Sequence, residues 1–131
     1  MPQICPLVLL SFLLLTSVRS NAQHMNEPDS PCARVVVTSE LADCLSKAIA
    51  TSDKELNSLY QKVLTRLNAS DTQRLTEAQR LWIQYRDANC SAERSLYKGG
   101  TALYPAYLAC LEAMTRSRTK ELYVTYTVRL K

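Results

Sequence analysis

The sequence predicts an all-α fold, a small antiparallel bundle of three main helices cross-linked by disulfides. From residue 38 onward, apolar residues recur every three or four positions, which is the period of a helix. The chain contains only two glycines, adjacent at 99–100, so little else interrupts the helices. Beyond residue 22 there are four cysteines, an even number that is typical of a small disulfide-bonded domain.

The N-terminal 22 residues are predicted to be a cleaved export signal. The segment 6–18 is almost wholly apolar but too short to cross a bilayer, and small residues follow it. An uncleaved anchor is the alternative, because no lysine or arginine precedes the apolar run. Residues 23–37 contain two prolines, His24 and no apolar periodicity, which predicts a flexible leader. A single helical domain is expected over 38–131.

The first predicted helix runs from about residue 39 to 67. Thr38 can cap its start, and Glu40 is favoured in its first turn by the helix dipole. Residues 52–55 also spell a capping box, so this segment is either one long helix or two helices that break near Thr51. The continuous form is favoured because the apolar stripe keeps its phase across the possible break.

Two further helices are predicted after a turn at 68–70. Ser70 with Gln73 forms a capping box that would open the second helix, which then runs to about Leu96. Pro105 suits the first turn of the third helix, which is expected to continue to about Leu122. The β-branched run at 124–128 could fray or extend this helix.

The four cysteines Cys32, Cys44, Cys90 and Cys110 allow three disulfide pairings. If the second and third helices fold back at Gly100, Cys90 and Cys110 lie at one level, which favours Cys90–Cys110 with Cys32–Cys44. The rival pairing of Cys32–Cys90 with Cys44–Cys110 stays open, because such counting constrains Cα separations only loosely. No two cysteines stand as close as in C-x-x-C, so the spacing predicts no metal site, and no cofactor is predicted.

The second helix carries a charged residue on the face that should be buried. At 100° per residue, one broad face holds Leu75, Ala78, Gln79, Trp82, Arg86, Asn89, Cys90 and Glu93. Because the preceding turn is short, this face is expected to pack on the first helix. A buried guanidinium without a partner costs several kcal/mol, so Arg86 should meet Asp53, Glu55 or Asp87.

These four residues are predicted to form a structural polar network, with a ligand site as the alternative interpretation. Trp82 is interpreted as a core anchor, as aromatic residues at helical spacing usually are. Arginine favours the structural interpretation because its guanidinium pairs well with carboxylate geometry.

Composition and residue inventory disfavour several classes of function. The formal net charge of +4 is mild and interspersed, with no basic block of the kind that binds nucleic acid. The only histidine, His24, lies in the leader and the cysteines are expected in disulfides, so no Ser-His or Cys-His arrangement can be built. Paired carboxylates can cleave glycosides, but here they lie level with arginines that keep them ionised. A non-enzymatic protein with a protein partner is therefore predicted, with no membrane span after the signal.

Five blocks of the sequence resemble the family of LprI-type lysozyme inhibitors. In chain order they are CARVVVTSELADC, SDKELNSLYQKVLTRL, LTEAQRLWIQYRDANC, GGT and CLEAMTRSRTKEL, and they span about residues 32–122. The resemblance implies an exported helical protein of bacteria, periplasmic or secreted, with lysozyme as the implied partner. The blocks also contain the polar residues discussed above and further family-pattern positions without an assigned role: Asn57, Tyr60, Gln79, Trp82, Thr115, Arg118 and Glu121.

Two functions follow from this resemblance. The first is inhibition of a lysozyme; the second is a periplasmic binding or structural module that works with an envelope or secretion partner and inhibits nothing. Many lysozymes are strongly basic, so a positively charged protein gains no help from net electrostatic steering toward them. An inhibitor of this charge would need a local feature that fits the enzyme.

Overall fold

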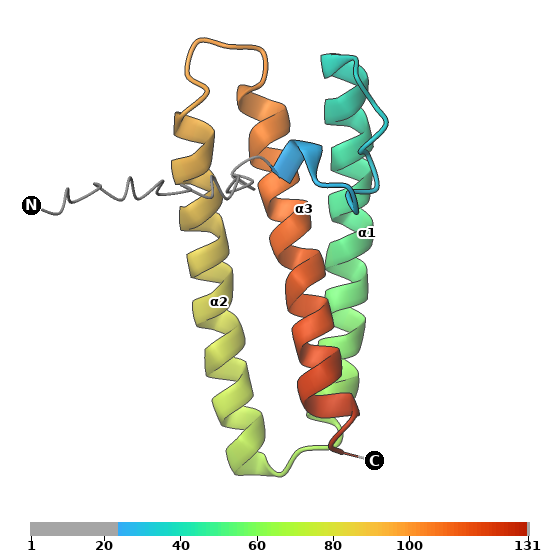
Figure 1. Ribbon diagram of the computed structural model, residues 1–131. Helices are drawn as coiled ribbons and strands as arrows, with labels where there is room; N and C mark the ends of the chain where they lie inside the picture. Colours follow the sequence, from blue (N-terminus) through green and yellow to red (C-terminus); the bar gives the residue numbers. More distant parts are fainter. Residues whose placement is uncertain (1–23, 131) are drawn as a thin grey trace, which may run out of the picture.

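The computed structural model describes residues 24–130 and contains three long helices, with no strand among those residues (Figure 1). Helix α1 spans Thr38–Leu64, α2 spans Ala69–Ser95 and α3 spans Leu103–Leu122. A 3-10 turn, η1 (His24–Asn26), precedes them, and a π-helical turn, η2 (Tyr123–Thr127), extends α3. The predicted all-α bundle is confirmed, whereas the predicted export signal at 1–22 lies outside the described residues.

Helix α1 is continuous, as the unbroken apolar stripe predicted. Thr38 is its first helical residue and does not cap it, because the N-cap position belongs to Val37, which offers no side-chain acceptor. The second possible helix start, at Ser52, lies inside the helix instead. The Ser52 hydroxyl donates across to the Glu112 carboxylate on α3, at 3.3 Å, rather than to its own backbone.

Helix α2 begins two residues earlier than the predicted capping box at Ser70. Its N-cap is Asn68, whose side-chain oxygen accepts the Asp71 backbone N–H at 2.9 Å. Asparagine caps as well as serine, and this cap already satisfies an N–H of the first turn, so Ser70 is left inside the helix. Pro105 lies in the first turn of α3, as expected.

Helix α3 lies between the other two helices (Figure 1). It packs extensively on both α1 and α2, whereas α1 and α2 touch each other little. The expectation that the buried face of α2 packs mainly on α1 is therefore wrong. A short turn brings consecutive helices together only at one end, while the disulfide between Cys90 and Cys110 draws α2 onto α3.

The interior consists of two apolar clusters separated by buried polar residues. The first cluster centres on Cys32, Leu45, Leu108 and Ala109, and the second on Leu56, Val63, Leu75 and Leu122. Four further buried polar side chains come from all three helices: Ser52 of α1, Gln79 of α2, and Glu112 and Thr115 of α3. We call these four residues, together with Arg86, Arg116 and Arg118, the polar layer.

The segment 24–37 contacts the bundle, although a flexible leader was predicted at 23–37. Its 3-10 turn contacts α3, and Cys32 is buried in its disulfide with Cys44 of α1. Prolines and missing periodicity argue only against a helix or strand, and this segment is positioned by a disulfide and by ion pairs instead.

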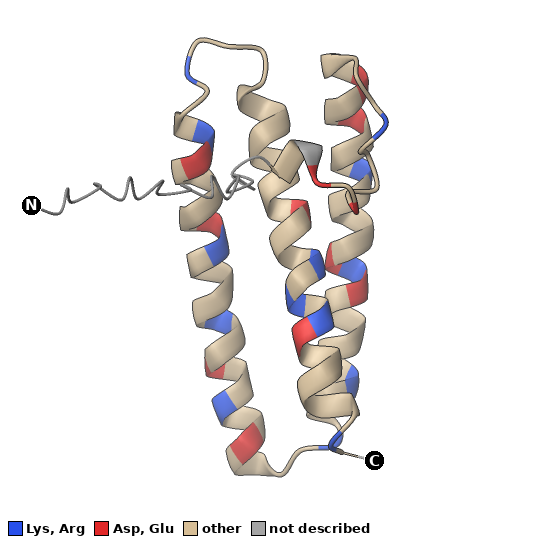
Figure 2. Cartoon of the chain, viewed as in Figure 1, with Lys and Arg blue, Asp and Glu red and all other residues tan. Residues whose placement is uncertain are grey.

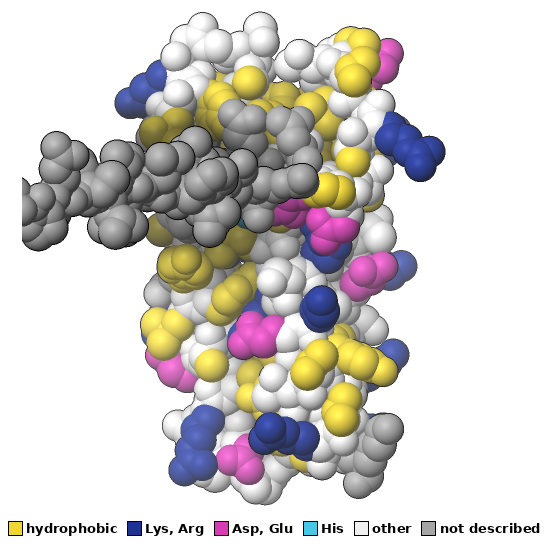
Figure 3. Space-filling view, in the orientation of Figure 1, with side chains coloured by type: hydrophobic (Ala, Val, Ile, Leu, Met, Phe, Trp, Pro, Cys, Tyr) yellow, Lys and Arg dark blue, Asp and Glu magenta, His cyan; other side chains and the backbone are white. Residues whose placement is uncertain are grey.

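Charged residues are spread over all three helices, without a block of one sign (Figure 2). In the space-filling view, hydrophobic side chains are interspersed with the charged ones on the face shown (Figure 3). Within residues 24–130, no helix combines the length and the apolar character that crossing a membrane requires.

Candidate functional site

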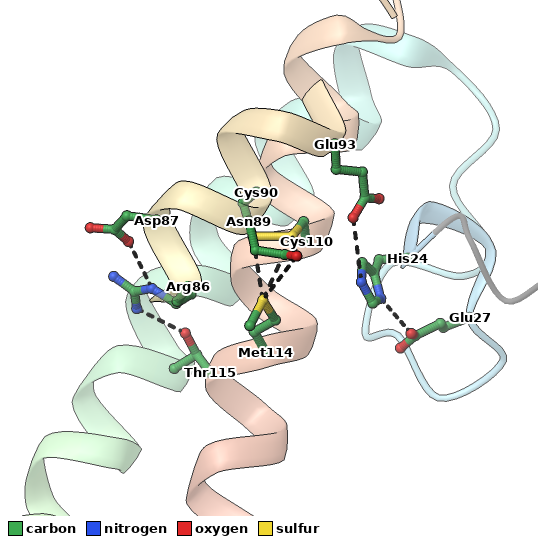
Figure 4. Close-up of a disulfide and its surroundings, with 10 residues drawn as sticks. All are labelled: His24, Glu27, Arg86, Asp87, Asn89, Cys90, Glu93, Cys110, Met114 and Thr115. Carbon is green, nitrogen blue, oxygen red and sulfur yellow. Dashed lines mark hydrogen bonds and ion pairs between the residues drawn. A yellow bond between two sulfur atoms is a disulfide. The ribbon is translucent and has the colours of Figure 1, made fainter. Parts of the chain in front are cut away.

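Arg86 joins all three helices within the polar layer. Its Nη1 lies 3.2 Å from Asp53 Oδ1 of α1 and donates to Thr115 Oγ1 of α3 at 3.0 Å. Its Nε donates to the neighbouring Asp87 carboxylate at 3.0 Å (Figure 4). The guanidinium also lies 5.3 Å from the centre of the Trp82 ring. The Arg86 side chain is only 15% exposed, so these contacts replace most of its hydration.

Glu55 does not reach this network. It is exposed on α1, and it takes part in none of the ion pairs found within residues 24–130. Being two positions after Asp53, it is turned about 200° around the helix axis, away from α2. Of the other family-pattern positions on α1, Asn57 is exposed, and the Tyr60 hydroxyl donates to Thr76 of α2 at 3.1 Å.

Two guanidinium groups approach the Trp82 ring. The Arg118 guanidinium of α3 lies 5.8 Å from the ring centre, and the Arg86 guanidinium lies 5.3 Å from it. Arg118 also donates to the buried Gln79 side chain at 3.1 Å and pairs with Glu121 at 2.9 Å. The indole is thus half-buried between α2 and α3, where its negative ring face attracts both cations.

Among residues 24–130 the most deeply buried charged residue is Glu112, which was not one of the predicted site residues. Its side chain is 2% exposed, and it accepts hydrogen bonds from Arg116 at 3.1 Å and from Ser52 at 3.3 Å. Arg116 continues outward to Glu27 at 3.1 Å and to Asp29 at 2.5 Å. One arginine therefore ties the 24–37 segment to the interior of the bundle.

The spacing of Glu112 on its helix is a signal that could have revealed its burial. It follows Leu108 by four residues and precedes Thr115 by three, which places all three on one helix face.

The hydrogen bond from Arg116 holds the pKa of the Asp29 carboxyl below its usual value. Burial lowers the pKa of Arg116, but its bonds to Glu112 and Asp29 outweigh this, and the net shift is upward.

His24 connects the same N-terminal segment to α2. Its Nδ1 lies 2.6 Å from Glu27 and its Nε2 lies 3.6 Å from Glu93 (Figure 4). Burial raises the pKa of Glu93, His24 opposes this shift, and Glu27 adds to it. The ligand atoms of His24, Glu93 and Cys110 lie within 4.8 Å of one another, but the sulfur of Cys110 is held in a disulfide and offers no thiolate to a metal.

The disulfides are Cys32–Cys44 and Cys90–Cys110. This is the pairing that was favoured because Cys90 and Cys110 are equally distant from Gly100 in the sequence. Cys90 and Cys110 of the second bridge are fully buried, and their Cα atoms lie 5.5 Å apart. The Met114 sulfur lies 3.7 Å from the Cys90 sulfur, and the Asn89 side-chain amide lies 3.6 Å from the Met114 sulfur (Figure 4). The bridge thus joins α2 to α3 beside the polar layer.

Replacing Arg86 by methionine is expected to lower the free energy of unfolding by about 2 kcal/mol, because the buried Thr115 hydroxyl loses its charged partner. The loss stays moderate because Asp53 and Asp87 are half-exposed and become hydrated. Urea unfolding followed by circular dichroism measures it. Arg80→Met is the matched control, since Arg80 is exposed and pairs with Glu77 of the same helix. Equal stability of both variants would favour the ligand-site interpretation of Arg86.

The fold, the bridges and the polar layer define a small disulfide-braced helical domain whose buried charges pair with one another. The family model described as Lysozyme inhibitor LprI matches residues 31–122, and the chain belongs to this family, as the sequence blocks predicted. It is similar to an uncharacterized protein of Rhizobium meliloti (strain 1021), with 32% identity over 126 residues that cover 86% of this chain and 88% of that protein. No solved structure matches the chain.

Proposed function

We propose that this protein binds and inhibits a lysozyme by docking on it, without catalysing a reaction itself. The observation that carries this proposal is membership of the lysozyme inhibitor family over residues 31–122, which include both disulfides and all three helices. Inhibition by docking requires a rigid surface, and the two bridges and the polar layer supply rigidity to a domain of this size.

Exposed apolar and aromatic side chains on α2, directly after it and at the start of α3 support a docking role. Leu81, Tyr85, Leu96 and Tyr104 are each at least half exposed. Large amphipathic or apolar side chains of this kind supply much of the binding energy at protein interfaces. The arginines of the polar layer, by contrast, are engaged inside the bundle, so we assign them to folding rather than to the partner.

The proposed location is the periplasm or the extracellular space. Two disulfides form and persist in oxidising compartments, where a lysozyme would also be met. The predicted export signal at 1–22 points the same way.

A binding or structural module with an envelope or secretion partner is the second candidate. The formal net charge of +4 favours it, because this charge does not steer the protein toward a basic lysozyme. Such a module would use the same exposed apolar and aromatic side chains to bind its partner, without blocking any enzyme.

Lysis of cell-wall suspensions separates the two candidates. The purified oxidised protein, from residue 23 onward, is mixed with several lysozymes, and the fall in turbidity is followed. We expect slower lysis by at least one lysozyme, with saturation as the protein is added in excess. Unchanged lysis by every lysozyme at excess protein would reject inhibition and leave the binding module. The same protein after reduction and alkylation of its disulfides serves as the control for non-specific effects of added protein.

A further inference from the structure

The segment between α2 and α3 forms one end of the molecule (Figure 1). We call residues 96–102 the tip loop. Leu96 is 80% exposed, and Lys98, Gly99, Gly100 and Thr101 are exposed as well. This loop joins α2 and α3, and its exposed residues are open to a partner.

The tip loop carries one lysine, Lys98, and no acidic residue. From residue 94 to 111 the sequence contains two basic residues, Arg94 and Lys98, and no acidic residue. Acidic residues at this end lie near the start of α1, where Glu40 and Asp43 are exposed. Figure 2 shows this separation, with basic colour on the loop between α2 and α3 and acidic colour at the start of α1.

The tip loop is held in one shape. Successive backbone hydrogen bonds run through it: Leu96 to Glu93, Tyr97 to Arg94, Gly100 to Tyr97, and Leu103 to Gly100, at 3.1, 3.1, 3.1 and 3.4 Å. The bridge between Cys90 and Cys110 fixes the two helices below it. A loop already ordered before binding loses little conformational entropy in a complex, which favours affinity.

The tip loop contains two glycines, and the backbone conformation favours glycine at only one of them. Gly99 has a φ of +82°, which strongly favours glycine there. Gly100 has no such requirement, and a Cβ added to it would meet only the Tyr97 carbonyl oxygen at an ordinary 3.5 Å. Nothing within the described chain therefore excludes a side chain at Gly100, whereas a closely fitting partner would exclude one.

The active-site cleft of a lysozyme has the complementary properties. Glycoside hydrolases of this kind place two carboxyl groups on either side of the bond they cleave, within a groove shaped for a sugar chain. A narrow loop with an ammonium group suits such a groove even where the enzyme is basic overall, because charges within a few ångströms dominate over net charge.

We propose that the tip loop enters the catalytic cleft of the inhibited lysozyme and that the Lys98 ammonium pairs there with the catalytic carboxylates. Leu96 packs against the rim of the cleft, and Gly100 allows the loop to enter it. This proposal rests on the proposed function and specifies the surface that performs it.

The test compares Lys98→Glu with Lys62→Glu, an equal charge change at an exposed site near the far end of α1. The inhibition constant is measured against a basic c-type lysozyme that the unmodified protein inhibits. We expect Lys98→Glu to weaken inhibition about thirtyfold or more, and Lys62→Glu to change it less than about threefold. Circular dichroism should be unchanged in both, since neither lysine takes part in the ion pairs of the described bundle. The unfolding temperature should fall only slightly for Lys62→Glu, because this change places an anion in the last turn of α1.

Two further measurements make the result specific to the loop and the cleft. Gly100→Leu should keep the unfolding temperature yet weaken inhibition, because it widens the loop. Tri-N-acetylchitotriose, which fills the cleft, should compete with binding of the inhibitor to the lysozyme. Full inhibition by Lys98→Glu and Gly100→Leu, or binding indifferent to the trisaccharide, would overturn the tip-loop proposal while inhibition itself stands. Failure of the unmodified protein to inhibit any lysozyme would overturn both.

Discussion

Replacement of Arg116 by methionine is expected to lower the free energy of unfolding by about 3 kcal/mol or more. The Glu112 carboxylate is almost wholly buried, and its partners are Arg116 and the weaker donor Ser52. Without the guanidinium, a buried anion keeps a single neutral hydrogen bond. The variant also loses the ion pairs to Glu27 and Asp29, which hold the 24–37 segment. Urea and thermal unfolding measure the loss.

Two matched variants show whether the buried anion causes this loss. Arg74→Met removes an arginine that is 78% exposed and paired with Asp71, and its cost should stay below about 1 kcal/mol. Adding Glu112→Met to Arg116→Met should restore much of the stability, because an apolar pair replaces an uncompensated charge. If Arg116→Met costs no more than Arg74→Met, the polar layer does not depend on this pair.

Removal of the bridge between α2 and α3, by Cys90→Ala with Cys110→Ala, is expected to cost about 3 kcal/mol. The bridge closes a segment with a sequence separation of 20, and opening it returns that conformational freedom to the unfolded chain. Both cysteines are fully buried, so the alanines also leave unfilled space beside Met114. Unfolding in urea, without reductant, compares this variant with the unmodified protein.

The first bridge provides the comparison for the second. Its separation of 12 residues gives a similar entropic contribution, but Cys32 lies in the 24–37 segment rather than in a long helix. Cys32→Ala with Cys44→Ala should therefore release this segment to proteolysis while α2 and α3 stay together. A loss below about 1 kcal/mol for the α2–α3 variant would show that helix packing alone holds these two helices.

Much of the fold could be predicted because helical periodicity and capping are local properties. The three helices, the unbroken α1 and the favoured disulfide pairing followed from residues within a few turns of one another. Pairing of Arg86 with a carboxylate of α1 followed from the cost of burying a lone charge, and Asp53 rather than Glu55 is the partner from α1. Whether Asp53 or Glu55 faces Arg86 depends on how α1 is rotated about its own axis, and the apolar periodicity does not determine this rotation.

The remaining features depend on which elements meet in space. Glu112 and Arg116 stand four residues apart on one helix, a spacing that usually indicates an exposed ion pair. Glu112 is nevertheless buried and bonded to Ser52 of α1, while Arg116 stays one-third exposed. Glu27 and Asp29 contact Arg116 across sequence separations of 89 and 87 residues. No local pattern encodes such a contact.

The central position of α3 has a consequence for how the nascent chain acquires its structure. Both other helices rest mainly on α3, and α3 is the last of the three to be synthesised. A chain truncated before residue 103 would hold two long helices that touch each other little and leave their apolar faces in water. Tertiary structure should therefore form only after translation has passed α3, and shorter fragments should remain protease-sensitive and open to chaperones.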